Sequence, residues 1–512
     1  MAQPDTPAPD PRPPAPSGPA PGLDKPTSAS RSSGSSWAAA GRWLAAIPSA
    51  LKSVAVGLGV TLAVLVAFEE FTGQRVVIEP FEVSGPLRDN GYTSRAVANK
   101  LIDQITAIRT TARTSMRRRQ FVSPPTDAAP SILVFGSGLS VDSVFQYLRE
   151  LLGREPVRII GELVTLPRGA GAEVEVRLTV RVRGKPPKTV SGPVGGMDGL
   201  LLQAAEHIIL HTQPYVLASY LYEVDPSRCR EVIRFVLQTD PPTDDARAYN
   251  LWGLLTRDAG DHARAVELFQ EAVRVAVDGD IRARAYTNRA ASLQVLGKQA
   301  EALEAVRQAI EADAAHAEAY HVWGLILAGM ASDQGAADGQ AVEKFRQAIS
   351  VDPRFAPAYY SLGDALAKRN DLEPAIEAYR QGLDLDRGSA GRHVRLARLL
   401  LLAKREEEAL RYLQRAVELD PASYEAQNAL GVALLRQGNL PAAFERFTRA
   451  KTLAPREASP YFNMGLIYRM GGEPRKAVQE FQTVLRLAPQ APEADRARRL
   501  VEELTPASAK AR

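Results

Sequence analysis

His207 and His211 have the spacing in this sequence that most resembles part of a metal site. They lie four positions apart, so on a helix both side chains would face the same side, as two ligands of one ion must. A zinc-protease motif needs Glu directly after its first histidine, and Ile208 stands there instead. Because no third ligand is evident, we expect two ordinary, partly buried histidines and no metal site.

One glycine-containing segment, residues 135–140 (FGSGLS), has the context of a phosphate-binding loop. It follows a strand-like stretch and precedes helical spacing. Val141 stands where the dinucleotide-binding pattern has its third glycine, and the sequence contains no GK[ST] motif. We therefore interpret the segment as a plain turn and expect no cofactor.

The remaining chemistry-bearing residues also fit no catalytic motif. The sequence has no GxSxG, no HExxH and no protein-kinase signature. With 63 basic and 59 acidic side chains the net charge is only +4, and the run Arg117, Arg118 and Arg119 has no accompanying aromatic platform, so we expect no nucleic-acid partner. The single cysteine, Cys229, excludes an intrachain disulfide. These observations predict a protein that is not an enzyme.

The N-terminal residues predict a tail followed by a membrane anchor. Residues 1–36 are rich in proline and serine and should be disordered, with a polyproline ligand as the alternative. Residues 53–68 carry no charge, and counting from Pro48 the helix would be about 31 Å long, enough to span a bilayer. We place this transmembrane helix at 48–71. A cleaved signal peptide and a buried helix of a soluble domain are the competing interpretations.

The charges around this segment predict its orientation. Basic residues precede it and acidic residues follow it, namely Arg31, Arg42 and Lys52 before and Glu69 and Glu70 after. The positive-inside rule then gives a single-pass inner (cytoplasmic) membrane protein with a cytoplasmic N-terminus and periplasmic C-terminal domains. A small-residue stripe suggests the hypothesis of a homodimer through the membrane, formed by Ala55, Gly59, Ala63 and Ala67. A location of the bulk of the chain in the cytoplasm remains an alternative.

Residues 75–210 predict a small α+β domain. Apolar and polar residues alternate strictly from 174 to 182, which is typical of a strand with one buried face. The run 157–166 before it and a short strand near 189–191 after it complete an antiparallel meander. Helical spacing at Val97, Leu101, Ile105 and Ile108, and again in 200–211, predicts helices that cover one face of the sheet.

From residue 246 onward the sequence repeats with a period of 34 residues. A small residue marks each copy, at Gly253, Ala290, Gly324, Gly363, Ala397, Gly431 and Gly465. Alanine follows in every copy, at Ala265, Ala302, Ala341, Ala375, Ala409, Ala443 and Ala477. We expect these small residues where two helix backbones pass closest, and large residues such as Phe269 and Phe447 between units.

This pattern resembles the tetratricopeptide repeat (TPR), whose units are antiparallel helix pairs. The resemblance predicts a mainly α protein: seven repeats at 246–491 in an α-α superhelix, preceded by a degenerate helical pair at 213–245 with Cys229 as a buried thiol. A capping helix would follow at 492–505.

The resemblance also implies a function, because in this family the concave surface formed by the first helices binds peptides or protein segments. The family's groove positions carry over to Arg247, Asn250, Arg257, Tyr360, Asp364, Arg398, Asn428, Phe462 and Arg469. We therefore expect a membrane-anchored protein–protein interaction scaffold. The alternative is an enzyme or small-ligand-binding protein in which the α+β module carries the activity and the repeats recruit the substrate.

Overall fold

The computed structural model describes residues 75–112, 120–122, 156–166, 174–238, 244–330 and 336–505. By internal contacts the chain divides into two units, 1–75 with 127–156 and 76–126 with 157–512, and nearly all described residues belong to the second. The predicted tail, the membrane helix, the segment 135–140 and the arginine run 117–119 all lie outside the described residues.

A mixed β-sheet forms the first region. Its strands are β1 (Arg75–Ile78), β2 (Glu82–Val83), β3 (Gln120–Val122), β4 (Val157–Leu166), β5 (Glu175–Val182) and β6 (Lys188–Pro193). The order is β3-β1-β4-β5-β6, with β2 also paired to β4. The expected antiparallel meander is β4-β5-β6, in which Leu163 pairs with Leu178 and Leu178 with Val190. The parallel pairing of β1 and β2 with β4 was not expected, because such short strands carry too few residues for a periodic signal.

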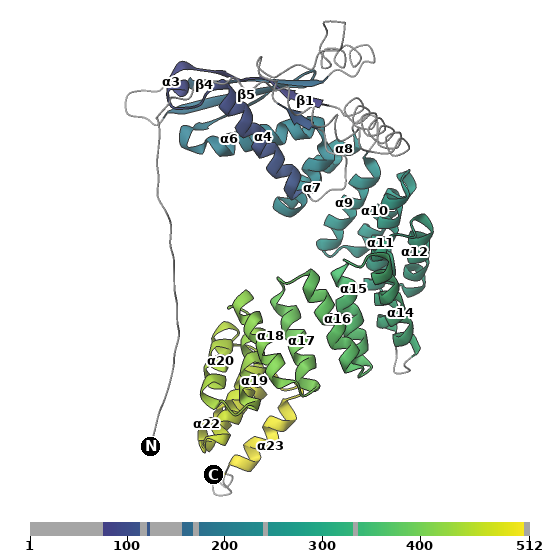
Figure 1. Cartoon of the computed structure of the whole chain (residues 1–512), viewed down its shortest axis with the longest axis vertical. Helices are drawn as coiled ribbons and strands as arrows, with labels where there is room; N and C mark the ends of the chain where they lie inside the picture. Colours follow the sequence, from purple (N-terminus) through teal and green to yellow (C-terminus); the bar gives the residue numbers. More distant parts are fainter. Residues whose placement is uncertain are drawn as a thin grey trace, which may run out of the picture. The chain divides into compact units, whose positions relative to one another are not determined.

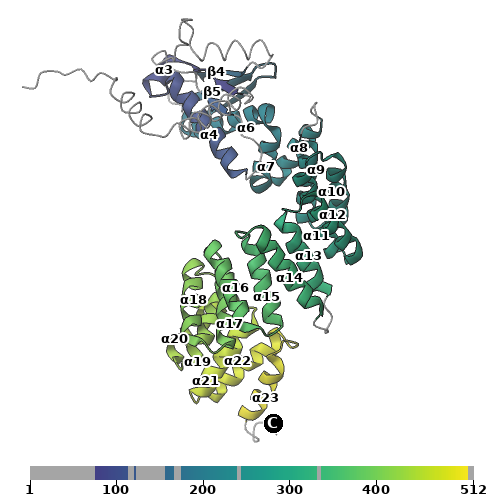
Figure 2. The same cartoon turned by 45° about the vertical axis from the view of Figure 1, so that its right-hand side comes forward.

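Two helices cover one face of this sheet, as Figures 1 and 2 show: α4 (Ser94–Thr111) and α6 (Met197–Thr212). A short helix α3 (Gly85–Asp89) and a 3₁₀ turn η1 (Val194–Gly196) complete the region. The alternation along β5 buries Val176, Leu178 and Val180 completely, while Arg177 and Arg181 of the same strand are exposed. Among the described residues the other face carries ion pairs, such as Arg181 to Glu162 at 3.0 Å.

The apolar core of the sheet region continues into the helices that follow it. Next come α7 (Pro214–Val224) and α8 (Pro226–Leu237). One cluster of buried side chains extends from Val76 in β1 through Cys229 in α8 to Leu255 in the following helix. Cys229 is fully buried and its Sγ donates to the Ala218 carbonyl over 3.1 Å, and burial raises the pKa of this thiol to about 12.

Seven consecutive helix pairs and one further helix follow among the described residues. The first helices of the pairs are α9 (Asp245–Asp258), α11 (Gly279–Val295), α13 (Ala317–Met330), α15 (Ala356–Lys368), α17 (Ala390–Leu402), α19 (Tyr424–Arg436) and α21 (Ala458–Met470). The second helices are α10 (His262–Val275), α12 (Gln299–Ala312), α14 (Ala336–Val351), α16 (Leu372–Leu385), α18 (Glu406–Leu419), α20 (Leu440–Leu453) and α22 (Pro474–Leu487), and α23 (Ala494–Leu504) closes the series. Each helix packs on the next one in the chain.

The marker residue of each pair is matched to the side chain that faces it from the second helix. Five markers are glycine, and a Cβ there would lie only 2.4–2.6 Å from a ring carbon: Gly253 below Phe269, Gly324 below Phe345, Gly363 below Tyr379, Gly431 below Phe447 and Gly465 below Phe481. Where the marker is Ala290 or Ala397, the smaller Val306 or Leu413 occupies the facing position. Each glycine marker therefore makes room for an aromatic ring of its own pair, and at Gly363 a backbone oxygen, that of Ala375, is also close.

The turn between the two helices of a pair requires a left-handed backbone. Gly260, Gly297, Gly438 and Gly472 occupy this position with φ between 73° and 87°. Asn370 and Lys404 adopt the same conformation in two other pairs, with φ of 64° and 60°. Lysine has no side-chain feature that relieves the steric cost of this conformation, so Lys404 is a strained position.

The predicted localisation is not supported. Within the described residues no helix is both long and apolar enough to cross a membrane; even the apolar α13 has 14 residues, or about 21 Å, against a hydrocarbon core of about 30 Å. The predicted span at 48–71 lies outside these residues. On this finding the expected single-pass inner-membrane topology with periplasmic domains is not supported, and neither is the homodimer through Ala55, Gly59, Ala63 and Ala67.

Candidate functional site

A pocket of about 430 Å³ lies where the first helices of the series begin. We call it the first-repeat pocket. The end of α4, one side of α7, and the first helices α9 and α11 line it. Leu251, Leu254 and Ile281 give it an apolar floor, and its polar groups are Tyr215, Ser219, Tyr222, Glu223, Arg247, Asn250, Asp280 and Arg284. The pocket therefore combines apolar surface with several hydrogen-bonding groups.

The charges of the first-repeat pocket are arranged as pairs. Arg247 Nη1 lies 3.3 Å from Asp244 Oδ1, and Arg284 Nε lies 3.1 Å from Asp280 Oδ1. The Arg284 pair is about half exposed and the Arg247 pair is more buried, so an incoming carboxylate competes more easily for Arg284 than for Arg247.

The two tyrosines of this pocket are hydrogen-bond donors at neutral pH. Burial raises the pKa of Tyr215 to about 12. Burial, together with a hydrogen bond that its hydroxyl donates to the Asp258 carboxylate, raises the pKa of Tyr222 to about 12. Neither phenol ionises near neutral pH, but the Tyr222 proton is already donated to Asp258, so only Tyr215 keeps a proton for an acceptor group of a ligand.

The two predicted asparagines belong to a ladder that links successive first helices. The Asn288 side-chain amide donates to Asn250 Oδ1 over 2.9 Å, and that of Asn463 donates to Asn428 Oδ1 over 3.1 Å. His321 Nε2 and Ser361 Oγ form the equivalent link, 2.9 Å apart. The position is thus used repeatedly to join neighbouring pairs, and each asparagine keeps part of its amide for other contacts.

The two predicted aromatic groove residues lie inside the repeat core. Tyr360 is 4% exposed and its hydroxyl donates to the Asp386 carbonyl over 3.2 Å. Phe462 is 5% exposed, with its ring centroid 5.6 Å from that of Phe481. Because their rings are committed to packing, neither belongs to the proposed binding surface.

The remaining predicted residues are charged and dispersed along the series. Asp364 accepts a hydrogen bond of 2.6 Å from Tyr379, and Arg257 lies 3.1 Å from Asp258. Arg469 lies 3.5 Å from Glu503 of α23, while Arg398 is exposed on α17. Of the nine predicted residues, the structure brings Arg247 and Asn250 together in one pocket and leaves the others apart.

Sequence reasoning missed several residues of this pocket. Arg284 stands in α11 at the same distance before its marker Ala290 as Arg247 does before Gly253, so the repeat register could have found it. Tyr215 and Tyr222 carry no such signal, because they precede the periodic sequence and reach the pocket only through the packing of α7 against α9.

A second pocket, of about 380 Å³, lies between α6 and α8. Two of its charged groups form an ion pair, with Arg228 Nη2 2.6 Å from Glu206 Oε2. His207 lines it and its Nε2 lies 3.1 Å from the Pro186 carbonyl oxygen. The rings of His207 and His211 meet edge to face, 4.6 Å between centroids. Burial lowers the pKa of His207 and lowers that of His211 to about 4, so both are neutral at pH 7.

Comparison with known proteins supports the repeat assignment. Sequence models described as tetratricopeptide repeat match residues 244–315, 339–390, 394–461 and 461–491. No curated protein matches this sequence.

Several solved structures are similar to parts of this chain. YrrB, described as a TPR protein with an unusual peptide-binding site, is 24% identical, with a TM-score of 0.33 over 38% of this chain and 99% of its own. The pilF protein of Pseudomonas aeruginosa is 17% identical, with a TM-score of 0.37 over 43% of this chain and 98% of its own. The APC/C hetero-tetramer Cut9–Hcn1 is 16% identical, with a TM-score of 0.42 over 60% of this chain and 59% of its own.

The helix pairs, the glycine markers fitted to aromatic rings and the matching family models agree over the same residues. Residues 244–491 of this chain are therefore an array of tetratricopeptide repeats.

Proposed function

We propose that this protein is an interaction scaffold that binds a peptide segment of a partner protein in the first-repeat pocket. The observation that carries the proposal is the composition of that pocket: two arginines, two tyrosines and an asparagine around an apolar floor. Tyrosine and arginine are the residues most enriched at the centres of protein interfaces. TPR proteins bind peptides or proteins, which agrees with this composition.

The chemistry of the pocket favours a peptide with a carboxylate next to an apolar side chain. Arg247 and Arg284 can bind a carboxylate in place of their own aspartates, which lie 3.3 Å and 3.1 Å away. The protonated hydroxyl of Tyr215 supplies a donor beside them, and the Tyr222 hydroxyl, which donates to Asp258, can accept a hydrogen bond. Leu251 and Leu254 supply the apolar contact.

The test is a peptide array that varies acidic and apolar positions, followed by fluorescence anisotropy of the best peptide. The double variant Arg247→Glu with Arg284→Glu should weaken binding at least tenfold, which corresponds to about 1.4 kcal/mol. Arg415→Glu is the matched control, because Arg415 is an exposed arginine on a second helix, paired with Glu418. The proposal fails if the double variant binds like the control, or if Arg398→Glu on α17 causes the larger loss.

The alternative, an enzyme or small-ligand-binding α+β module, is not favoured. The second pocket touches that module through Lys188, Gln203 and His207. However, Glu206 and Arg228 form an ion pair there, and His207 lies within hydrogen-bond distance of the Pro186 carbonyl. These groups are engaged in holding the fold together.

A further inference from the structure

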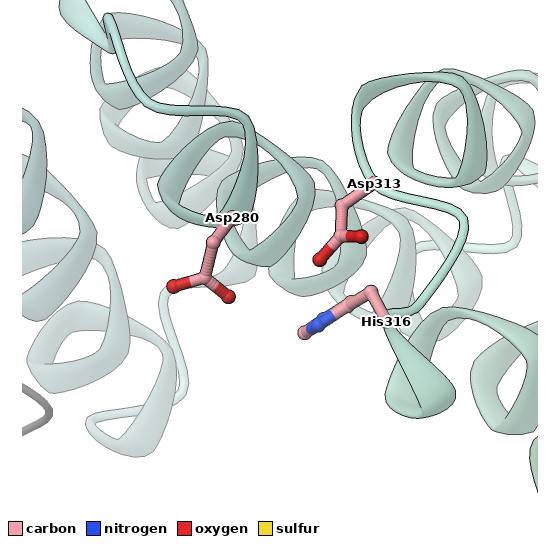
Figure 3. Close-up of side chains that lie close together, drawn as sticks. All are labelled: Asp280, Asp313 and His316. Atoms are coloured by element: carbon pink, nitrogen blue, oxygen red, sulfur yellow. The ribbon is translucent and has the colours of Figure 1, made fainter. Parts of the chain in front are cut away.

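Three side chains of the types that bind metal ions meet at the junction between the second and third repeats. Asp280 lies in the first turn of α11, Asp313 directly follows α12 and His316 directly precedes α13. Figure 3 shows the two carboxylates and the imidazole gathered around one space, and one ligand atom of each lies within 4.8 Å of the other two. No other group of this kind occurs in the described parts of the chain, which contain all six histidines.

His316 is the member of this group that the packing of the repeats leaves without a partner. The residue is only 7% exposed, and its Nε2 is buried without a hydrogen-bond partner. The nearest charged group is the Glu318 carboxylate, 4.0 Å away. Burying an unsatisfied polar nitrogen costs about 1–3 kcal/mol, a cost that a bound ligand would remove.

The later repeats show which part of the arrangement is ordinary. Asp313 Oδ1 accepts a 2.9 Å hydrogen bond from the Ala315 amide. The same turn recurs at Asp352, Asp386 and Asp420. Three residues beyond those aspartates stand Phe355, Ser389 and Ser423. The aspartate therefore belongs to the repeat turn, and the histidine is particular to this junction.

The charge of the group suits a divalent cation. Asp280, Asp313 and Glu318 contribute three negative charges, and Arg284, which lies 3.1 Å from Asp280, contributes one positive charge. The net charge is therefore −2 when His316 is neutral. In a tetrahedral zinc site with bonds of about 2.0–2.2 Å, the ligand atoms lie about 3.3–3.6 Å apart. The three ligand atoms lie within 4.8 Å of one another, so a bound ion would draw them closer together.

We propose that Asp280, Asp313 and His316 bind a divalent transition-metal ion. An imidazole combined with carboxylates suits Zn²⁺, whereas Mg²⁺ and Ca²⁺ prefer oxygen ligands alone. The ion would tie the start of the second repeat to its end and to the start of the third. It would also hold Asp280, which lines the first-repeat pocket.

Isothermal titration of the chelator-treated full chain with zinc chloride tests the site. We expect one ion per chain. Asp313→Asn, which keeps the turn acceptor, and His316→Gln should each weaken binding by more than the 10–100-fold typical for loss of a residue that only supports a ligand. Asp420→Asn, the same change in a later turn, and His211→Gln should leave the affinity unchanged.

Circular dichroism of each variant establishes that it is folded, and Asp313→Asn decides the question if His316→Gln does not fold. Absence of zinc binding, or equal binding by the wild type and Asp313→Asn, would overturn the proposal. Magnesium or calcium binding as tight as that of zinc would also overturn it, because the imidazole would then contribute nothing.

Discussion

The sheet region and the repeat series bury their apolar side chains in different ways. In the first region a single cluster joins β1, β4 and β5 with α4, α6, α7, α8 and α9. From the second repeat onward the core is divided into smaller clusters, each built from helices close together in the chain. Strands about 80 residues apart pair directly in the sheet region, whereas each repeat helix packs mainly on its neighbours in the chain. We expect that region to unfold as one unit and the repeats to respond locally.

The largest effect is expected from a cavity in the shared core. Leu178 in β5 is fully buried, so Leu178→Ala should lower the free energy of unfolding by about 2–5 kcal/mol. Because β5 shares its cluster with α7–α9, hydrogen exchange should accelerate in all of these elements together. Faster exchange restricted to β5 and its neighbouring strands would contradict the idea of one cooperative unit.

A smaller and more local effect is expected from a repeat marker. Gly431→Ala places a methyl group only 2.6 Å from the Phe447 ring. Overpacking of this kind lowers the free energy of unfolding by about 1–3 kcal/mol. Adding Phe447→Leu should recover at least about 1 kcal/mol, since the pair would then match Ala397 with Leu413. Urea denaturation of the two single variants and the double variant measures this coupling. If the losses in the free energy of unfolding were strictly additive, the residues at positions 431 and 447 would not be coupled.

Acid should weaken both regions through buried histidines. Burial lowers the pKa of His211 in α6 and of His321 in α13 to about 4, from about 6.5 in an unfolded chain. Between pH 6.5 and pH 4 each of these histidines is protonated in the unfolded chain but not in the folded one. Their contribution to the free energy of unfolding is therefore fully present above pH 6.5 and is lost as the pH falls toward 4.

Urea midpoints at pH 7 and pH 5 test this dependence. His211→Gln should reduce the pH dependence of the unfolding transition of the sheet region. His321→Gln should reduce the pH dependence of the unfolding transition of the repeats. If either variant changed the pH dependence of both transitions equally, the two regions would not unfold separately.

The smallest effect is a gain at a turn. Lys404 has φ of 60° at the turn position that Gly438 and Gly472 occupy in other repeats. Lys404→Gly should raise the free energy of unfolding by up to about 1 kcal/mol, because it removes side-chain strain at the cost of some chain entropy. Asn370→Gly is the control and should gain less, since asparagine tolerates this conformation. A lower melting temperature for Lys404→Gly would refute the account.

The periodic part of the fold was predictable, because each helix pair is specified by residues close together in the chain. The 34-residue spacing located the markers, and strict alternation of apolar and polar residues located β5. The same register places Arg247 and Arg284 at equivalent positions of two repeats. Sequence therefore determined the repeats, the meander β4-β5-β6 and the arginines of the pocket.

Tertiary structure decided what depends on contacts between distant residues. The parallel pairing of β1 with β4 joins strands about 80 residues apart, as Val76 pairs with Val157. Tyr360 and Phe462 hold groove positions in the repeat pattern, yet packing turns their rings into the core. Tyr215 meets Arg284 only because α7 packs beside α9, and His316 meets Asp280 only where two repeats join. Periodicity indicates which face of a helix is apolar. It does not indicate which element covers that face, because that depends on how residues distant in the sequence pack together.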